Sequence, residues 1–303
     1  MKLYVRFFLT IIGVVLFFAP SARTQTLELG IGLGISAYNG DILPDALSFT
    51  KTSALAGQVQ ISFHLNERWK AQVFYNRGRL KGADADFGRH NRNLSFVTNI
   101  DELGVRGIFN LIRFDPYGES GSPFTAYVGT GLTVYHFNPF TTNLQGQKVF
   151  LQEVGTAGQY LPNEQDRPRP YNLFQLGIPI TMGVSYAVTP QLILGLEVDY
   201  RWLFTDYIDD IGPDRYPDFD NLLLSGDQAA LLTNRGWESV YDPDQGINPI
   251  DVAKMYYQDN NLSSSFRSIG QGNDVFGFIL FKISYMLEEI SFGGKSKFGC
   301  YSF

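Results

Sequence analysis

The 303-residue chain has very little cysteine and histidine: one cysteine, Cys300, and three histidines, His64, His90 and His136. A single cysteine cannot form a disulfide within its own chain, and three histidines so far apart lack the spacing of a zinc site. No serine or aspartate stands at a spacing that marks a catalytic triad with them. The sequence therefore predicts a protein with no disulfide framework, no metal centre, no cofactor and no enzymatic activity.

Basic residues are also scarce, with 24 lysines and arginines against 30 acidic residues and a net charge of −6. Residues 1–24 hold three of the basic residues (Lys2, Arg6 and Arg23) and no acid, so the remaining chain carries −9. The chain has no basic cluster, and nucleic-acid-binding domains are typically basic. These features exclude nucleic acid as a partner.

The only long apolar run lies at the N-terminus. Lys2 and Arg6 precede the apolar residues 7–19, and a short stretch with small residues follows as far as Thr24. This is the pattern of a secretory signal peptide over residues 1–24, and no cysteine follows it to anchor a lipoprotein. Since no later run approaches the length of a membrane helix, we expect an exported chain that crosses no membrane as a helix.

Aromatic residues and glycine are abundant instead, with 17 Tyr, 25 Phe and 31 Gly. They occur in segments that alternate apolar and polar residues, which is the period of a β-strand. This alternation predicts eight strands, at about 27–35, 52–65, 69–80, 96–111, 124–137, 174–187, 191–204 and 274–285.

The first of these segments has glycine at every second position: Gly30, Gly32 and Gly34. A dinucleotide-binding loop needs the pattern G-x-G-x-x-G before a helix, but Ile35 stands at the position of the third glycine. Tyr38, Asn39, Gly40 and Asp41 then favour a turn. The glycines are therefore expected on the crowded inner face of a strand, where they leave room for larger side chains from neighbouring strands.

Two all-β folds share this composition: an outer-membrane barrel and a soluble sandwich. The connections are predicted to alternate between short and long, as in bacterial barrels with short periplasmic turns and long outer loops. The apolar faces end in aromatic residues, as an interfacial girdle requires. We therefore predict an eight-stranded antiparallel transmembrane β-barrel over 25–286, integral to the outer membrane and its lipid, with periplasmic termini and a periplasmic tail over 287–303.

The faces opposite the apolar ones are too polar for a sandwich core but suit the inside of a narrow barrel. Five charged residues there are expected to form an internal ion-pair network: Glu102, Arg106, Glu197, Asp199 and Arg201. Side chains fill the interior of a barrel of this size, so we do not expect a diffusion pore.

The longest connection, 205–273, is predicted to contain short helices over 221–234 and from Asn248 to about Tyr257. Its acidic residues Asp209, Asp210 and Asp214 do not follow the spacing of a calcium-binding loop. A solvated acidic loop is expected there.

Several short motifs resemble one family. They are Leu33–Asp41, Tyr135–Pro139, Gly155–Gln159, the stretch Thr205–Asp210 after Arg201, and the ending Lys297–Phe303. Together the chain resembles the PorG-type outer-membrane barrels of the type IX secretion system of Bacteroidota. The residues that carry the likeness in the loops are Tyr38, Gly40, Asp41, Thr205, Asp206, Tyr207, Asp209 and Asp210.

The resemblance implies a non-catalytic component of a protein-transport machine that contacts a periplasmic ring lipoprotein. It implies that the loop motifs shape the extracellular mouth and that the tail is one candidate for the ring contact, the turn at 112–122 being the other. The tail residues concerned are Lys295, Lys297, Phe298, Cys300 and Phe303. Two departures, the large 205–273 loop and Tyr301 in place of a proline after Cys300, allow a paralogue with another partner.

Two other functions compete with this interpretation. An adhesin or surface receptor would bind through the 205–273 loop. A lipid-modifying enzyme in the membrane would use His64, His90 or His136.

Overall fold

The computed structural model describes residues 26–43, 49–117, 121–161, 168–268 and 273–287. The predicted signal peptide and the tail beyond residue 287 lie outside these residues. Eight long strands dominate the fold: β1 (Thr26–Asn39), β2 (Ala54–His64), β3 (Trp69–Ala83), β4 (Ser95–Asn110), β5 (Phe124–His136), β8 (Phe174–Ala187), β9 (Leu192–Leu203) and β10 (Val275–Leu287).

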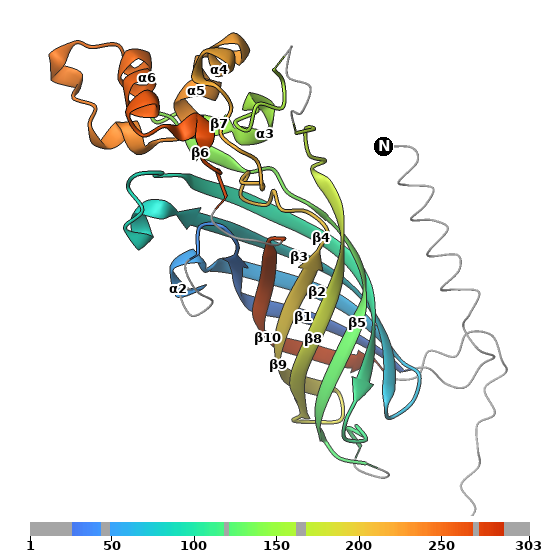
Figure 1. Cartoon of the computed structure of the whole chain (residues 1–303). Coiled ribbons are helices and arrows are strands. Elements are labelled where there is room, and N and C mark those ends of the chain that lie inside the picture. The colour runs from blue at the N-terminus through green and yellow to red at the C-terminus, as the bar shows by residue number, and fades with distance from the viewer. Residues whose placement is uncertain (1–25, 44–48, 118–120, 162–167, 269–272, 288–303) are drawn as a thin grey trace, which may run out of the picture.

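The eight strands close into one antiparallel barrel (Figure 1). Each strand pairs with the next along the chain, and β1 pairs with β10 to complete the ring, with Leu29 opposite Tyr285. The predicted all-β fold class is therefore confirmed. Closure satisfies the backbone N–H and C=O groups of every strand, because no unpaired edge remains.

Strand positions follow the predicted alternation closely, and β8 coincides with its predicted range. Two ends differ. Tyr38 and Asn39, predicted in a turn, continue β1 because they pair with Phe276 and Val275 of β10. β3 runs on from Leu80 to Ala83, which pairs with Ser95 of β4.

The extension of β3 changes one expectation about the connections. The connection between β3 and β4 shrinks to 84–94 and becomes shorter than the turn at 111–123, so the predicted strict alternation of short and long is wrong at this point. The connections still fall into two groups, one at each end of the barrel. Those at 65–68, 111–123 and 188–191 lie at one end, and those at 40–53, 84–94, 137–173 and 204–274 lie at the other (Figure 1).

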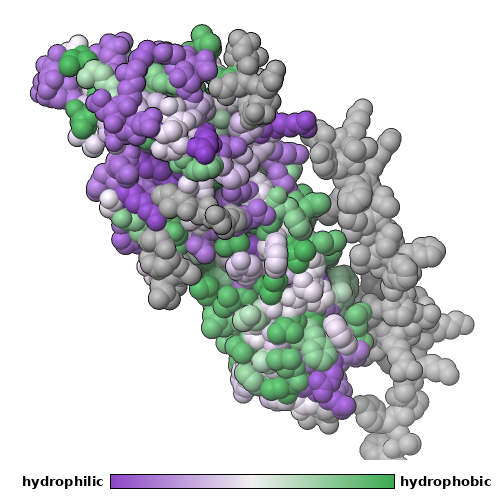
Figure 2. All heavy atoms as spheres, viewed as in Figure 1, coloured by the Kyte–Doolittle hydropathy of each residue, from purple (hydrophilic) through white to green (hydrophobic). Residues whose placement is uncertain are grey.

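The outer wall of the barrel is an apolar band, visible as the green region of Figure 2. Its side chains are highly exposed: Leu55 is 86% exposed, Leu33 69% and Leu132 61%. No helix of the described residues is both long and apolar enough to cross a membrane. Aromatic residues are frequent in the band, including Trp69, Tyr186, Tyr200, Trp202 and Tyr285.

The alternating glycines of β1 face the barrel interior, as predicted. A β-carbon on Gly34 would stand 1.9 Å from the carbonyl oxygen of Ile279 in β10, and one on Gly30 would stand 2.5 Å from Oγ of Ser284. Glycine at these positions lets β1 and β10 approach closely enough to close the ring.

Short elements cover the end of the barrel that carries the longer connections (Figure 1). A hairpin of β6 (Phe140–Thr142) and β7 (Lys148–Phe150) extends from β4, where Phe140 pairs with Val97. The other short elements are α2 (Phe49–Thr52), η2 (Asp84–Phe87), α3 (Leu151–Val154), α4 (Phe219–Ser225), α5 (Asp227–Thr233), η3 (Gly236–Ser239), η4 (Pro243–Gln245), α6 (Pro249–Asp259) and η5 (Leu262–Ser264).

The predicted single helix over 221–234 is two helices, α4 and α5. Gly226 breaks it, because its φ of +121° is incompatible with a continuing helix. α6 begins where predicted: Pro249 occupies its first turn, and the Asn248 side chain accepts a hydrogen bond from the backbone N–H of Ile250.

Candidate functional site

The barrel interior is filled by charged side chains that pair with one another. Arg106 of β4 reaches across to β9, with Nη2 at 2.8 Å from Oε1 of Glu197 and Nη1 at 2.8 Å from Oδ1 of Asp199. All three side chains are 0% exposed. Removing two charges from water is costly, and such direct pairing is what offsets that cost.

A second arginine, Arg201 of β9, extends the pairing. It donates to both carboxylate oxygens of Glu102 and lies 3.4 Å from Asp199. The five residues predicted to form the network are therefore brought together.

The structure adds a sixth member, Lys282 of β10, whose Nζ lies 2.7 Å from Oε2 of Glu197. Sequence reasoning missed it, although its place on the inward-facing positions of β10 was a usable signal. We call Glu102, Arg106, Glu197, Asp199, Arg201 and Lys282 the lumen network.

Uncharged side chains complete the hydrogen bonds of the lumen network. Tyr127 donates its hydroxyl to Glu197 at 2.8 Å, Asn76 donates to Glu102 at 2.7 Å, and Arg106 Nε donates to Gln72 at 2.5 Å. These partners come from β3 and β5, whereas the charged residues come from β4, β9 and β10, so the network ties opposite walls of the barrel together. A column of paired side chains thus occupies the space that a pore would need.

A smaller cluster closes the end of the barrel that carries the short turns. Glu28 of β1 accepts from His64 Nε2 at 2.8 Å and from Lys70 Nζ at 3.4 Å. Together with the lumen network, the inward strand positions hold four buried carboxylates and four buried lysines or arginines. The interior is therefore neutral when His64 is uncharged.

The three histidines are far apart. His64 lies at the short-turn end beside Glu28, and His90 is exposed in the 84–94 connection. His136 packs against Phe174 on the outside of the barrel, with ring centres 4.7 Å apart and the ring planes tilted by 52°. Within the described ranges, no three His, Cys, Asp or Glu residues are placed to hold a metal ion. The histidines therefore do not converge on one site.

The loop residues that carried the family resemblance meet at the opposite end. Tyr38 donates its hydroxyl to Asp209 and also lies 3.3 Å from Oδ1 of Asp274, whose other oxygen accepts from the backbone N–H of Ile208 at 2.8 Å. Gly40 packs against the same pair, since a β-carbon there would stand 1.9 Å from Oδ1 of Asp274. The two motifs therefore meet at Tyr38 and Asp209.

Asp210 organises the other half of this end. Its carboxylate accepts from Thr156 and from Tyr171 at 2.8 Å, and pairs with Arg267 at 3.2 Å. Tyr207 stacks on Tyr171 with ring centres 5.0 Å apart and donates to Asp214 at 2.7 Å. Thr156, from the Gly155–Gln159 motif, thereby meets the Thr205–Asp210 motif.

These contacts contradict one expectation. Asp209 and Asp210 are 2% and 0% exposed, so the acidic stretch is not a solvated loop. Its carboxylates are buried because tyrosine and threonine hydroxyls satisfy them. We call Tyr38, Asp41, Asp206, Asp209, Asp210, Arg267 and Asp274 the mouth cluster; Thr205 is buried beside it.

The mouth cluster has more carboxylates than cations, and this shifts their ionisation. Burial, with the nearby Asp41, raises the pKa of Asp209 to about 8 and that of Asp206 to about 7. Burial also raises the pKa of Asp210, although Arg267 opposes the shift. Part of the cluster therefore stays protonated at neutral pH, which lets the carboxylates pack closely.

The long 204–274 connection has a hydrophobic core of its own. Trp237 is 2% exposed and donates its indole N–H to the carbonyl of Leu231 at 3.0 Å. Around it are packed Tyr216, Phe219, Leu222, Ala229, Ala230, Ala253 and Tyr257. We call this unit the helical cap; its core shows that the loop is a folded element.

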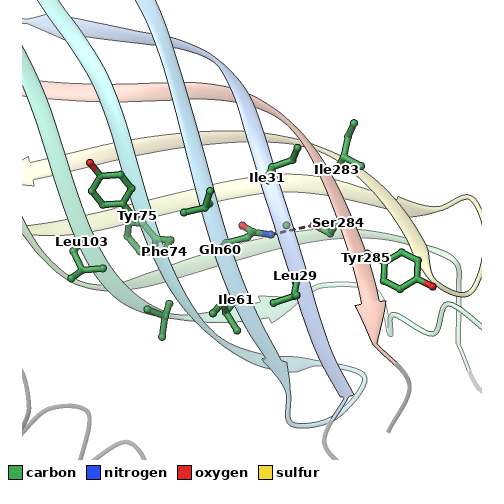
Figure 3. A pocket seen from close by; sticks show the side chains of 13 residues that line it. Leu29, Ile31, Gln60, Ile61, Phe74, Tyr75, Leu103, Ile283, Ser284 and Tyr285 are labelled. Carbon is green, nitrogen blue, oxygen red and sulfur yellow. Dashed lines mark hydrogen bonds between the residues drawn. The ribbon is translucent and has the colours of Figure 1, made fainter. Parts of the chain in front are cut away.

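The barrel wall also carries an open apolar groove of about 600 Å³ across β10, β1, β2 and β3 (Figure 3). Leu29, Ile31 and Ile283 line it from the outer face. Gln60 and Ser284 point inward and toward each other, with Nε2 and Oγ 3.3 Å apart. The groove is therefore a furrow that opens on the outer face of the barrel wall.

Comparison with known proteins identifies one family and several similar folds. The model of a family described as a domain of unknown function (DUF6089) matches residues 5–226. A search of curated proteins finds no match.

Among solved structures, Neisserial surface protein A (NspA) is 11% identical with a TM-score of 0.40, covering 87% of this chain and 99% of its own. Ail of Yersinia pestis is 8% identical with a TM-score of 0.40, covering 88% and 100%. OprG of Pseudomonas aeruginosa is 8% identical with a TM-score of 0.35, covering 87% and 97%.

Proposed function

We propose that this chain, which belongs to the DUF6089 family, is a non-conducting and non-catalytic anchor in the outer membrane. The observation that carries the proposal is the lumen network. Its charged groups are buried and paired across the barrel, so the interior offers neither a water path nor a free reactive group. A barrel of this kind acts through its ends and its outer wall.

The exposed apolar band supports the proposed location. Leu33 and Leu55, on the outer face of the closed barrel, each expose more than two thirds of their surface. Such exposure of apolar side chains is unfavourable in water and favourable in lipid. Bacterial barrels of this type place their short turns in the periplasm and their long loops outside. In that orientation, the helical cap is extracellular and both termini are periplasmic.

The resemblance to PorG-type barrels supports a more specific role, a component of type IX secretion that contacts a periplasmic ring lipoprotein. The tail residues Lys295, Lys297, Phe298, Cys300 and Phe303 lie outside the described residues. The turn at 111–123 is the second candidate contact; it closes with backbone hydrogen bonds between Asp115 and Ser122 and between Ser122 and Arg113.

Affinity purification of the tagged protein from outer membranes in mild detergent tests this role. We expect a periplasmic lipoprotein to co-purify in stoichiometric amount, and its loss when residues 288–303 are deleted. The matched control deletes 215–265, which removes most of the helical cap and spares the periplasmic end. Recovery of the barrel alone from the full-length protein would contradict the ring-contact proposal.

A surface receptor is the second candidate, because the helical cap has its own core and lies above the membrane in this orientation. The same two deletions separate the candidates. A receptor loses surface binding when 215–265 are deleted and keeps it when 288–303 are deleted.

A further inference from the structure

Positive charge on the outer wall of the barrel is confined to one strand. Along the eight strands, all of which the structure describes, lysine and arginine point outward only on β3, at Arg77, Arg79 and Lys81. Alternate residues on one face of a strand lie about 7 Å apart, so the three cations form a row. The corresponding ends of β8 and β9 expose only apolar side chains on their outer faces, among them Phe174 and Trp202.

The row borders an open groove of about 910 Å³. Leu33, Leu55 and Val59 form its apolar walls, and Arg77 and Arg79 form its charged end. Gly57 of β2 stands directly opposite Arg77 and Leu33 in the sheet, and a β-carbon there would meet no atom closer than 3.7 Å. The missing side chain leaves a channel that leads from the arginines into the apolar band.

The neighbours of the arginines only partly neutralise them. Arg77 lies 3.5 Å from Asp101, which also accepts from the Tyr75 hydroxyl at 2.5 Å. Arg79 donates from Nε to Asn99 at 3.2 Å. Asp101 is the one carboxylate that points outward from the eight described strands, so three cations face a single anion there. The Arg77 side chain remains 67% exposed.

The groove continues along the wall. It shares Ile31, Val59 and Tyr75 with the 600 Å³ furrow of Figure 3, which extends it toward the short-turn end. The combined feature has a cationic end beside the extracellular loops and a long apolar remainder. This arrangement is complementary to a lipid with an anionic headgroup and an apolar acyl chain.

We propose that this outer groove binds a phosphate-bearing lipid of the outer leaflet, with its phosphate at Arg77 and Arg79 and an acyl chain along Gly57. Arginine suits this role because its planar guanidinium donates two parallel hydrogen bonds to phosphate oxygens. The leaflet follows from the proposed orientation of the barrel, but the binding itself does not depend on any periplasmic partner. In a Gram-negative outer leaflet the lipid of this chemistry is lipid A.

The test titrates lipid A, with and without its phosphates, into the purified full-length protein in neutral detergent and measures binding by native mass spectrometry. Arg77→Gln with Arg79→Gln should weaken binding of phosphorylated lipid A by about fivefold per arginine. The control, Arg68→Gln with Arg113→Gln, removes the same charge from the periplasmic turns and should bind as the wild type does.

A second pair of variants tests the apolar part without changing charge. Gly57→Leu fills the channel and should reduce binding, whereas Gly107→Leu places the same side chain at an outer position of β4 away from the groove, where a β-carbon clashes with nothing, and should not reduce binding. Three outcomes would each overturn the proposal. They are equal affinity of the two arginine double variants for phosphorylated lipid A, equal affinity of the wild type for lipid A with and without its phosphates, and unchanged affinity in Gly57→Leu. Arg77→Gln, Arg79→Gln and Gly57→Leu lie on the outer wall away from both candidate ring contacts, so they should not change co-purification of the ring lipoprotein, and the two proposals fail independently.

Discussion

At the scale of single residues, Arg106 has the largest expected effect on stability. It pairs with two buried carboxylates. Among the ion pairs described, its loss would leave Glu197 with Lys282 as its cation and Asp199 with a longer contact to Arg201. Removing one partner of a buried ion pair typically costs about 3–5 kcal/mol. We therefore expect Arg106→Leu to lower the free energy of unfolding by about that amount, measured by urea titration in lipid vesicles.

The control for this prediction is Arg77→Leu, which breaks an ion pair on the exposed outer wall. Exposed pairs contribute about 0–1 kcal/mol, so its effect should be small. Similar losses for the two variants would show that the lumen network does not hold the barrel together.

Asp209 gives a prediction about pH. Its pKa is about 8 in the fold, whereas an aspartate in an unfolded chain ionises near pH 4. The fold therefore retains a proton that the unfolded chain releases, and stability falls as pH rises from about 4 to 8. Hydrogen-exchange protection factors in the 204–274 connection, which correct the observed rate for the base-catalysed intrinsic rate, should be higher at pH 5 than at pH 9.

Asp209→Asn should flatten this pH dependence, because an amide keeps a hydrogen-bond acceptor for Tyr38 and cannot ionise. The facing groups Asp41, Asp206 and Asp274 oppose ionisation and Arg92 favours it, so some slope remains. Asp244→Asn, in an exposed turn, is the matched control. An unchanged slope in Asp209→Asn would remove Asp209 as the source.

At the scale of secondary-structure elements, the closure of β1 on β10 depends on Gly34. A β-carbon there would meet the backbone of β10 at Ile279, which cannot rotate away as a side chain could. We expect Gly34→Ala to destabilise the barrel by about 1–3 kcal/mol, in the range of overpacked interiors. The folded fraction after refolding into vesicles measures the effect.

Gly107→Ala is the comparison for this prediction, since nothing lies within 4 Å of the added carbon. It should refold as well as the wild type. If Gly34→Ala refolds equally well, the two strands can separate without cost and the close approach is not required for closure.

Much of the strand arrangement could be predicted because a two-residue period also says which side chains face lipid. Ends of strands were less predictable. Tyr38 carries turn-forming neighbours, yet it stays in β1 because its hydroxyl and backbone find partners in other segments. Gly226 was hidden within a helical pattern, and only its φ reveals the break.

The candidate site was predictable only in part for a related reason. Inward positions identified Glu102, Arg106, Glu197, Asp199 and Arg201 as lumen residues. Contact between β4 and β9 across the lumen depends on barrel diameter and register, which one sequence does not specify. For the same reason, the sequence did not predict the pairing of Lys282 with Glu197 or the hydrogen bond between Thr156 and Asp210.

At the scale of the whole molecule, the filled interior predicts an absence of conductance. The reconstituted protein should show no ion current in planar bilayers, because paired side chains from several strands occupy the lumen. The variant that lacks 215–265 should also show no ion current, since the lumen network lies within the barrel and not in the helical cap. Stable single-channel steps from the wild type would contradict the anchor proposal.

Lys282 also has a consequence for how the barrel is made. Before β10 is added, the inward positions of the other seven strands carry three cations and four carboxylates, and Lys282 supplies the missing charge. The last strand to be synthesised is thus both the seam of the ring and its neutralising element. A barrel that lacked β10 would expose an interior with excess negative charge to lipid. We therefore expect the unpaired edges of β1 and β9 to face water during assembly, and insertion into the membrane to be completed only after β10 has paired with both.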